Sequence, residues 1–422
     1  MSFKLSSPDF WSKDALDKER RRELYVCHTC RLCFNLCPYF PAFFDKIDGV
    51  DGDLKQLDYE ALTDLTELCY QCKLCFVRCP YTPPHEFAID IPRLLLRAKA
   101  VEGRRRGVPL RDRLLGDTNR LGGLGKRTSR LANWVHKNKF MRGLMHDSLG
   151  IHRDRLLPIY HGKTFEEQYA AWRKNTAQLL STKSKGKVAL FYTCFVNYNY
   201  PSIGMAAVDV LHRNGVEVVC PSQKCCGMPF LDGGQLDHAL ENAAFNVRSL
   251  ASFVKEGYDV VVLGPTCGYV LRTEYPTMLE MGEDVKLIRQ RTSDICEYLV
   301  RLHKAGQLNT TFSWSPGKMA YHMPCHHKAQ GVGYRSLELL KLIPGAEVQF
   351  IDKGCSGMDG TWGFKREFFE LSLKVGSGLI KGVKDAQPAF PVTDCPMAAL
   401  QIEQGTGLKP LHPVEVLQKA YG

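Results

Sequence analysis

The sequence contains no apolar stretch that could act as a signal-peptide core or cross a membrane. Its first residues, MSFKLSSPDFWSKDALDKERRREL, are mostly polar and charged, and no window of about 18 apolar residues occurs anywhere in the chain. These absences argue against a secreted precursor and against an integral membrane protein. We therefore expect a cytoplasmic protein.

A dinucleotide-binding fingerprint is also absent. No G-x-G-x-x-G run opens a helix, so the sequence predicts neither a flavin site nor a nicotinamide site. A redox protein without an organic cofactor of its own needs a catalytic partner subunit. We therefore assign no catalytic residue, and the sequence leaves open whether the chain is an enzyme by itself.

The composition indicates a globular protein with one strongly basic segment. Hydrophobic residues make up 44% and charged residues 24% of the 422 positions, and the formal net charge is +11. A chain of this length is expected to form two or three domains. Nearly all of the excess charge lies between residues 104 and 155, where fourteen Lys and Arg stand against four Asp.

Cysteine, in contrast, is abundant. The chain has 17 cysteines, and disulfides are rare in the reducing cytosol, so metal binding or redox chemistry is the leading interpretation. Eight of them form two runs of identical spacing, CHTCRLCFNLCP from Cys27 and CYQCKLCFVRCP from Cys69. Each run has the form C-x2-C-x2-C-x3-C-P, which is typical of two-cluster ferredoxins.

The fourth cysteine of each run is predicted to bind the cluster of the other run, because a tight loop cannot bring its own next cysteine to the fourth iron. One [4Fe–4S] cluster is then assigned to Cys27, Cys30, Cys33 and Cys79. The other [4Fe–4S] cluster is assigned to Cys69, Cys72, Cys75 and Cys37. Zinc is the alternative, but a tetrahedral zinc site gives no reason for a third evenly spaced thiol and a Cys-Pro in both runs.

The C-terminal half has a different pattern, which repeats. Short apolar runs such as VALFYT, VEVVC and DVVVLG alternate with helix-like segments, and KMAYH, EVQFID and AFPVT do so again. This alternation predicts α/β layers with mostly parallel strands. Cysteines that follow these strands recur at an offset of about 130 residues, which indicates two tandem units of one fold.

Motifs in this half resemble those of a known family. Ferredoxin runs followed by Cys, Cys-Cys-Gly and Cys are similar to the B/D group of heterodisulfide reductase subunits, whose CCG domains take their name from this motif. Within the group, the chain most resembles the family of the C subunit of anaerobic glycerol-3-phosphate dehydrogenase. The resemblance is carried by CFVNYN at Cys194, KCCGMPF at Lys224, EYP at Glu274, HMPCH at His322, GTWGFK at Gly360 and TDC at Thr393.

The resemblance implies a further metal centre in the first CCG unit. In the family, five thiolates of a full unit can hold an unusual [4Fe–4S] cluster. Carried over to this chain, the ligands are Cys194, Cys225, Cys226 and Cys267. The fifth position is Val270, and four thiolates still suffice for either a third iron–sulfur cluster or zinc.

The second CCG unit departs further from the family pattern. Ser356 and Ala398 stand where cysteines are expected. The remaining candidate metal ligands are Cys325, Cys355 and Cys395. Either Ser356 and His326 or His327 complete this set, or the unit has decayed to a scaffold. Gly227 and Gly357 follow the motif cysteines, where a tight turn would need a residue that tolerates positive φ.

These patterns predict an α+β and α/β protein. We expect a helical, ferredoxin-like domain with two [4Fe–4S] clusters in residues 1–100 and a basic helical linker in 101–186. Two tandem α/β CCG units are expected to follow, the first in residues 187–312 and the second, degenerate one in 313–422.

The basic segment has two interpretations. Leu131, Trp134 and Leu144 fall near a helical period among many Lys and Arg. Such a helix can lie on an anionic membrane, on the inner face, and the resemblance implies the same, with electrons passed to quinone. The other interpretation is a helical hairpin that buries these side chains against its own α/β domain. Nucleic acid is a weaker candidate, because no binding motif accompanies the charge.

Three functions are compatible with these patterns. The favoured one is an iron–sulfur subunit that relays electrons from a flavin-dependent dehydrogenase, of the glycerol-3-phosphate dehydrogenase type, to quinone or another acceptor. The alternative is a heterodisulfide or thiol–disulfide reductase acting at a cluster in a CCG unit. The substitutions at Val270, Ser356 and Ala398 weigh against it. The third is a docking module in which only the ferredoxin part conducts.

Overall fold

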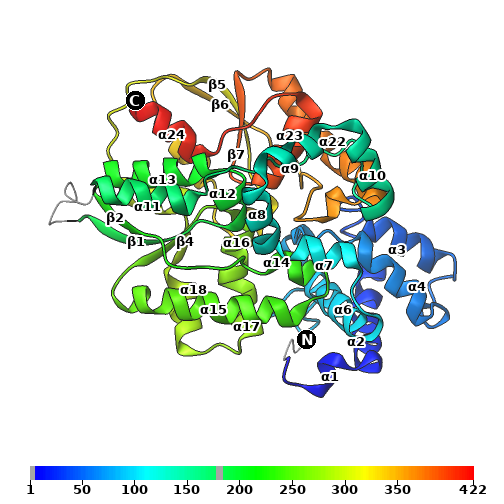
Figure 1. Ribbon diagram of the computed structural model, residues 1–422. Coiled ribbons are helices and arrows are strands. Elements are labelled where there is room, and N and C mark those ends of the chain that lie inside the picture. Colours follow the sequence, from blue (N-terminus) through cyan, green and yellow to red (C-terminus); the bar gives the residue numbers. More distant parts are fainter. Residues whose placement is uncertain (1–4, 177–183) are drawn as a thin grey trace.

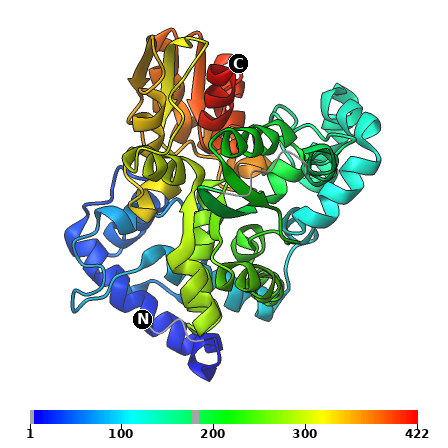
Figure 2. The same ribbon diagram turned by 90° about the vertical axis from the view of Figure 1, so that its left-hand side faces the viewer.

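The computed structural model describes residues 5–176 and 184–422 and contains two parallel sheets and a separate group of N-terminal helices (Figure 1). The N-terminal helices, in blue, lie together at the lower right. The sheets lie at the centre and the top, and helices α7 to α10 lie across the front, between the two groups. The view turned by 90° shows the same cyan helices at one edge of the molecule (Figure 2).

The N-terminal part is helical. Its elements are α1 Pro8–Trp11, α2 Lys13–Cys30, α3 Tyr39–Asp48, η1 Leu54–Gln56, α4 Tyr59–Asp64, η2 Leu65–Leu68, α5 Leu74–Arg78 and α6 Ile91–Arg106. Helix α2 is 18 residues long and ends at Cys30, within the first cysteine run. Ser12 caps this helix by accepting a hydrogen bond from the Ala15 N–H at 3.2 Å, and Leu16 and Leu24 bury its inner face.

The basic segment forms a set of short helices. They are α7 Leu110–Gly116, α8 Thr118–Arg127, α9 Ser129–Lys137 and α10 Lys139–Leu149, followed by α11 Phe165–Thr176. Polar side chains start two of them, because Asp117 and Asn138 accept backbone N–H groups of the first turns of α8 and α10 at 3.1 Å. Gly150, at φ 65°, ends α10 in the left-handed conformation.

Of the two interpretations of this segment, the hairpin that buries its large apolar side chains does not hold. Leu131 is 61% exposed, Trp134 53% and Leu144 52%. The segment is held by its polar groups instead. The buried Arg142 guanidinium donates to the carbonyls of His152 and Arg155 at 2.6 and 2.8 Å, so the polar side of the helices faces inward at this point.

The first α/β unit has a four-stranded parallel sheet in the order β2-β1-β3-β4. Its strands are β1 Gly186–Phe191, β2 Val216–Val219, β3 Asp259–Val262 and β4 Thr292–Asp294. Its helices are α12 Cys194–Tyr198, α13 Pro201–Arg213, α14 Met228–Asp232, α15 Leu236–Lys255, α16 Pro265–Tyr269, η3 Val270–Glu274, α17 Tyr275–Met278, α18 Glu283–Arg291 and α19 Ile295–Lys304. Strand β4 was not predicted, because its three residues, TSD, form no apolar run.

The second unit repeats this arrangement with three parallel strands in the order β6-β5-β7. They are β5 Gly317–His322, β6 Ala346–Phe350 and β7 Phe390–Thr393. The helices are α20 Cys325–Gln330, α21 Arg335–Leu340, η4 Trp362–Phe364, η5 Arg366–Phe368, α22 Phe369–Ala386, α23 Pro396–Thr406 and α24 Pro413–Tyr421. The prediction of a helical N-terminal domain and two tandem α/β units is confirmed.

The two units share one hydrophobic core. Val188 and Leu190 of the first sheet belong to the same buried cluster as Met319 and Val392 of the second. Helix α24 at the C-terminus packs on α13, and the Tyr421 hydroxyl donates to the Asn309 carbonyl at 2.7 Å. The sheets are therefore fixed relative to each other, which fixes the loops at their carboxyl ends as well.

Candidate iron–sulfur sites

The first thiol nest lies at the end of α2. It is a small cavity lined by Cys27, Cys30, Cys33 and Cys79. Cys27 and Cys30 are in the last turns of α2, and Cys79 directly follows α5. The aromatic rings of Phe40 and Phe44 from α3 close the cavity, so three thiols of one run and one thiol of the other face the same apolar space.

The second thiol nest is its counterpart. It is lined by Cys37, Cys69, Cys72 and Cys75, together with Tyr39, Tyr70 and Pro92. Only Pro38 separates Cys37 from the start of α3. Cys69 and Cys72 precede α5, and Cys75 lies within it. The structure therefore brings together both predicted sets of four cysteines, each with its fourth member taken from the other run.

The surroundings of the nests fit a metal cluster. Burial, and then the neighbouring thiols Cys79 and Cys30, raise the pKa of Cys33 to about 11. Burial raises the pKa of Cys69 to about 12, and the pKa of Cys37 is raised by burial and its neighbours too. Four such thiols in an apolar space ionise only together with bound cations, and an all-thiolate set suits a [4Fe–4S] cluster.

A third group of thiols lies at the carboxyl ends of three strands of the first sheet. Cys194 starts α12 after β1, Cys225 and Cys226 follow β2, and Cys267 lies in α16 after β3. The sulfurs of Cys194 and Cys225 are 3.9 Å apart. Because parallel strands end at one edge of a sheet, residues distant in sequence meet here.

These four thiols interact closely. Hydrogen bonds from the Cys194 and Cys226 thiols lower the pKa of Cys225, while the pKa of Cys226 is raised by its contacts with Cys225 and Cys267. Val270, at the position of the family's fifth cysteine, is fully buried. The first CCG unit thus offers a four-thiol nest with an apolar fifth position, which fits an iron–sulfur cluster or zinc by its donor set.

The predicted need for glycine after the motif cysteines is confirmed. Gly227 has φ 102° and Gly357 has φ 80°, in the region that only glycine adopts without strain. At Gly357 a Cβ atom would also lie 2.5 Å from the Ser372 carbonyl oxygen. The Gly357 N–H donates to the Cys355 sulfur at 3.4 Å, so the turn directs a backbone dipole at a candidate ligand.

The cysteines of the second unit meet the ferredoxin part. The sulfurs of Cys325 and Cys355 are 3.8 Å apart, and Cys355 is also hydrogen-bonded to Cys72 of the second nest. Cys395 packs in an adjacent apolar cluster with Met397. The structure therefore brings two of the three predicted cysteines together, beside a thiol that the sequence assigned elsewhere.

The two histidines that could complete this set have other partners in the structure. His326 uses both ring nitrogens, Nδ1 with the Thr266 hydroxyl at 2.8 Å and Nε2 with the Gln71 carbonyl at 2.9 Å. Both nitrogens of His327 face carboxylates, Asp294 at 3.2 Å and Asp394 at 3.8 Å. Both rings are therefore directed at groups other than the thiols of Cys325, Cys355 and Cys395.

A buried ion pair joins the second nest to the first CCG unit. Lys73, which lies between Cys72 and α5, is 2% exposed, and its Nζ lies 3.5 Å from Oε1 of Glu274, which is 1% exposed. In η2, just before this loop, the Glu67 carbonyl accepts from the Trp362 indole of the second CCG unit at 2.8 Å. The second nest is therefore held between the two CCG units.

Sequence reasoning missed one buried polar cluster. Asp294, His327 and Asp394 place ligand-type atoms within 4.8 Å of one another. Although burial lowers it, the two carboxylates raise the pKa of His327 overall. Asp294 ends β4 and Asp394 follows β7, so the cluster joins the two units. The dipeptides Ser-Asp at the end of β4 and Thr-Asp at the end of β7 were the available signal.

Among the helices in residues 5–176 and 184–422, none combines the length and the apolar character of a membrane-spanning segment.

Comparison with protein families matches residues 20–104 to the citrate utilization protein B Fer4-like domain and residues 188–272 to the cysteine-rich domain CCG. Both matches support the assignment of iron–sulfur clusters to this chain.

The chain is also similar to curated proteins. It is 34% identical over 402 residues to the C subunit of the anaerobic glycerol-3-phosphate dehydrogenase of Escherichia coli K12, covering 93% of this chain and 98% of that one. It is 31% identical over 248 residues to the B subunit of the fumarate reductase (CoM/CoB) of Methanothermobacter marburgensis, which covers 56% of this chain and 46% of that protein.

A third relative is shorter in its match. The lactate utilization protein A of Geobacillus thermodenitrificans is 29% identical over 187 residues, 42% of this chain and 75% of its own length. Together with the matched domains and the thiol nests, these relatives identify an iron–sulfur electron-transfer protein. The near full-length match decides the family: the chain belongs to that of the C subunit of anaerobic glycerol-3-phosphate dehydrogenase.

Proposed function

We propose that this chain carries electrons from a flavin-dependent dehydrogenase subunit to a quinone at the membrane surface. The observation that carries the proposal is the pair of crossed four-thiol nests, of which the second contacts both CCG units. When bound, [4Fe–4S] clusters accept and donate one electron at a time. The first and second nests are proposed to hold one such cluster each.

A third centre is proposed at the four thiols of the first CCG unit, with iron–sulfur preferred over zinc because it can conduct. For the second unit we propose a structural role at Cys325, Cys355 and Cys395, since its histidines bond to other partners and Cys395 packs in a different apolar cluster from Cys325 and Cys355. The division of the chain at about residues 100, 186 and 312 is proposed on the same grounds.

The protein's own contribution to the relay is to fix the centres against one another. The segment from Cys69 to Cys75 carries three candidate ligands of the second nest. It is held by the ion pair of Lys73 with Glu274 and by the hydrogen bond between the Gln71 carbonyl and His326. Backbone and amide N–H groups are directed at the sulfurs, as in the donation from the Gln71 amide to Cys69 at 3.4 Å. Such donors and the buried surroundings set the potentials of iron–sulfur centres.

A catalytic partner is needed, because this chain has no flavin or nicotinamide fingerprint. The relative of similar length is named as a subunit of a dehydrogenase. We propose that the partner is a flavoprotein that oxidises glycerol 3-phosphate or a similar small hydroxy compound, and that electrons enter this chain at the N-terminal nests.

The membrane contact is proposed at the basic helices. Several exposed cations form no ion pair with any described residue: Arg113, Arg120, Arg127, Arg130, Lys137 and Lys139. They lie among exposed apolar side chains such as Trp134 and Phe140, which is 79% exposed. A surface of this kind binds anionic lipid headgroups through its charges and the acyl boundary through its apolar side chains. The inner face of the membrane is the proposed location.

Metal analysis tests the proposal. The chain, purified anaerobically, is expected to contain about twelve irons if three [4Fe–4S] clusters are present and about eight if only the ferredoxin nests are filled. Cys225→Ser should lower the count, whereas Cys220→Ser, outside every thiol nest, should leave it unchanged. A count near zero with bound zinc would overturn the relay.

A further inference from the structure

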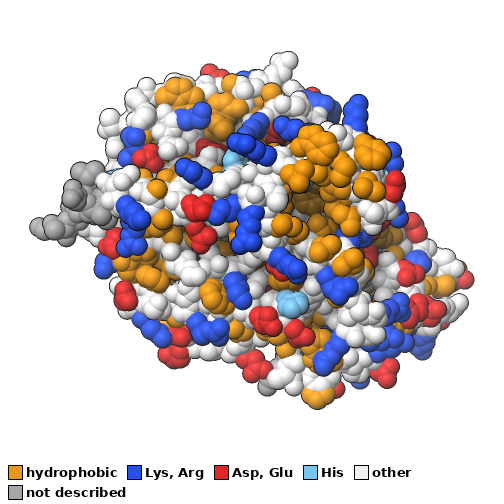
Figure 3. Space-filling view, in the orientation of Figure 1, with side chains coloured by type: hydrophobic (Ala, Val, Ile, Leu, Met, Phe, Trp, Pro, Cys, Tyr) orange, Lys and Arg blue, Asp and Glu red, His pale blue; other side chains and the backbone are white. Residues whose placement is uncertain are grey.

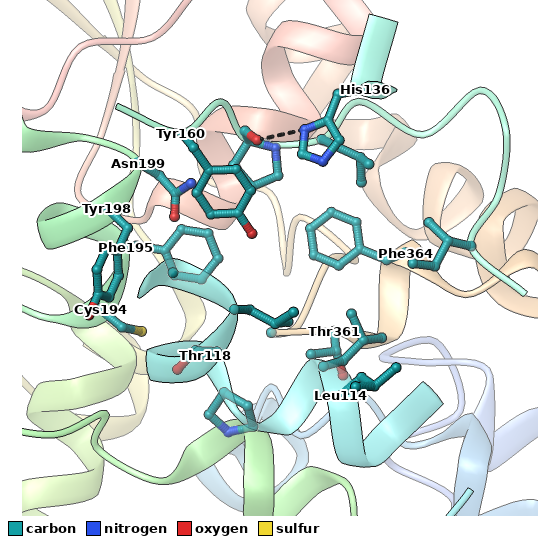
Figure 4. Close-up of a pocket in the computed structure, with 18 of the residues that line it drawn as sticks. Leu114, Thr118, His136, Tyr160, Cys194, Phe195, Tyr198, Asn199, Thr361 and Phe364 are labelled. Carbon is teal, nitrogen blue, oxygen red and sulfur yellow. Dashed lines mark hydrogen bonds between the residues drawn. The ribbon is translucent and has the colours of Figure 1, made fainter. Parts of the chain in front are cut away.

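We infer that a cavity beside Cys194 binds the ring of a lipophilic quinone and releases it as quinol. The inference rests on the proposed electron-transfer function and adds to it the site of the acceptor. The cavity has a volume of about 240 Å³ and is enclosed by α7 to α10, α12 and the loop 360–364 (Figure 4). It therefore lies between the basic helices and both CCG units.

The size and lining of the cavity suit an uncharged ring. An apolar cavity of ~150 Å³ is sufficient to bind benzene. Most of the lining is apolar, and includes Leu114, Leu115, Leu121, Met145, Leu149, Ile151, Leu157, Phe195 and Phe364. One arginine, Arg111, also lines it, but its guanidinium is occupied by Glu367, with Nη1 3.0 Å from Oε2. A charged disulfide would find no free cation there.

A candidate cluster ligand forms part of the wall. Cys194 lines the cavity, and its sulfur lies 3.9 Å from that of Cys225 in the first CCG nest. Figure 4 shows the Cys194 side chain at the edge of the cavity, close to Thr118. Electrons that reach this nest could pass to a bound ring without crossing further protein.

Two polar groups face the ring position from the opposite wall. The Tyr160 hydroxyl points into the cavity, and the His136 ring lies beside it with a centroid distance of 5.8 Å (Figure 4). His136 Nδ1 donates to the Pro158 carbonyl at 3.1 Å, which leaves Nε2 as an acceptor. Burial, and then Arg142, lower the pKa of His136 to about 4, so the ring is neutral at physiological pH.

These groups match both states of the carrier. The Tyr160 hydroxyl can donate to a quinone carbonyl, and His136 Nε2 can accept from a quinol hydroxyl. Reduction consumes two electrons, which originate from the substrate oxidised on the partner, and two protons, which come from water. Both carbonyl oxygens become hydroxyls, and the quinol leaves.

The cavity opens on the surface that is proposed to meet the membrane. Leu114, which lines it, is 39% exposed, and Leu124 and Phe140, on the lining helices α8 and α10, are 60% and 79% exposed. Figure 3 shows hydrophobic side chains gathered around a hollow on this face. An apolar tail could therefore run from the cavity into the acyl region of the bilayer. Water-soluble acceptors would need no such opening.

Photoaffinity labelling tests the inference. The anaerobically purified complex of this chain with its dehydrogenase is labelled with an azido-quinone, and the modified peptides are identified by mass spectrometry. Labels are expected in residues 114–160 and 194–199. Leu114→Trp fills the mouth and should weaken labelling about tenfold, whereas Leu110→Trp, on the same helix but outside the lining, should change it less than about twofold.

Two more measurements separate the possible failures. Tyr160→Phe removes one hydrogen bond and should raise the KM for quinone by about fivefold with iron content unchanged. Reduction of a water-soluble dye by the same complex reports electron transfer without the cavity. Labelling elsewhere, or equal labelling of the two tryptophan variants, would overturn the quinone site while dye reduction stands. If the wild-type complex did not reduce the dye at all, the proposed function would be overturned instead.

Discussion

The buried pair of Lys73 and Glu274 gives the sharpest prediction about how the ferredoxin part is held. Glu274→Gln removes the carboxylate but keeps the size of the side chain. Its Oε1 lies 3.5 Å from Lys73 Nζ, and its Oε2 lies 3.7 Å from an Arg93 nitrogen. Arg93 keeps a second ion pair, with Asp90 at 3.3 Å, so the substitution mainly affects Lys73.

The magnitude follows from the burial of Lys73. Its side chain is 2% exposed, and although burial lowers its pKa, the surrounding groups Tyr269, Glu274, Asp90 and Asp232 together raise it overall, so it is charged at neutral pH. Breaking a buried pair by removing one partner costs about 3–5 kcal/mol. We expect the lower end, about 3 kcal/mol, because the Gln71 side-chain oxygen still accepts from Lys73 at 2.6 Å.

Thermal unfolding of the anaerobic protein, followed by circular dichroism, measures the effect. Unfolding entropies of roughly 2 cal/mol/K per residue convert 3 kcal/mol into a fall in Tm of about 3 °C for a chain of this length. Glu283→Gln, at an exposed position, should change stability by less than about 0.5 kcal/mol. Adding Lys73→Met to Glu274→Gln should recover most of the loss. The reasoning would be refuted if Glu274→Gln had the Tm of the wild type, or if the double variant had a lower Tm than Glu274→Gln alone.

Three further predictions follow from buried groups. Burial lowers the pKa of His322 to about 3, so below pH 6.5 the unfolded chain binds a proton that the folded chain does not. The free energy of unfolding should therefore fall by up to about 1.4 kcal/mol per pH unit, and His322→Asn should weaken this pH dependence when denaturant midpoints are measured across the range. Gly122→Ala would place a Cβ 2.1 Å from the Tyr198 ring and should destabilise by about 1–3 kcal/mol in thermal melts, while Gly123→Ala, with open space around it, should not. Arg155→Met removes hydrogen bonds that tie the basic segment to the second unit, among them one to Ser372 at 2.8 Å, and faster limited proteolysis between residues 101 and 186 should report the loss.

Local patterns were sufficient to predict the elements of the fold and the two thiol nests. The cysteine spacing fixed which sulfurs can share a cluster, and apolar runs located six of the seven described strands. Strand β4 was missed because hydrogen bonding to β3, through the pairing of Val261 with Ser293, and not composition, makes TSD a strand. The bounds of helix α2 could not be predicted, because its buried face depends on packing against α6.

Contacts between distant segments could not be predicted in the same way. His326 looked free to bind a metal, but its partners Gln71 and Thr266 come from other parts of the chain. The contact of Cys72 with Cys355 likewise depends on how the domains dock. For the basic segment, periodicity showed an apolar stripe at Trp134 but not whether protein or solvent covers it.

Low-temperature electron paramagnetic resonance of the anaerobic complex tests the central claim most directly. Addition of the dehydrogenase substrate should produce the signals of reduced [4Fe–4S] clusters in this chain, and a lipophilic quinone should then abolish them. A colourless, zinc-loaded chain, or clusters that the substrate does not reduce, would contradict the account.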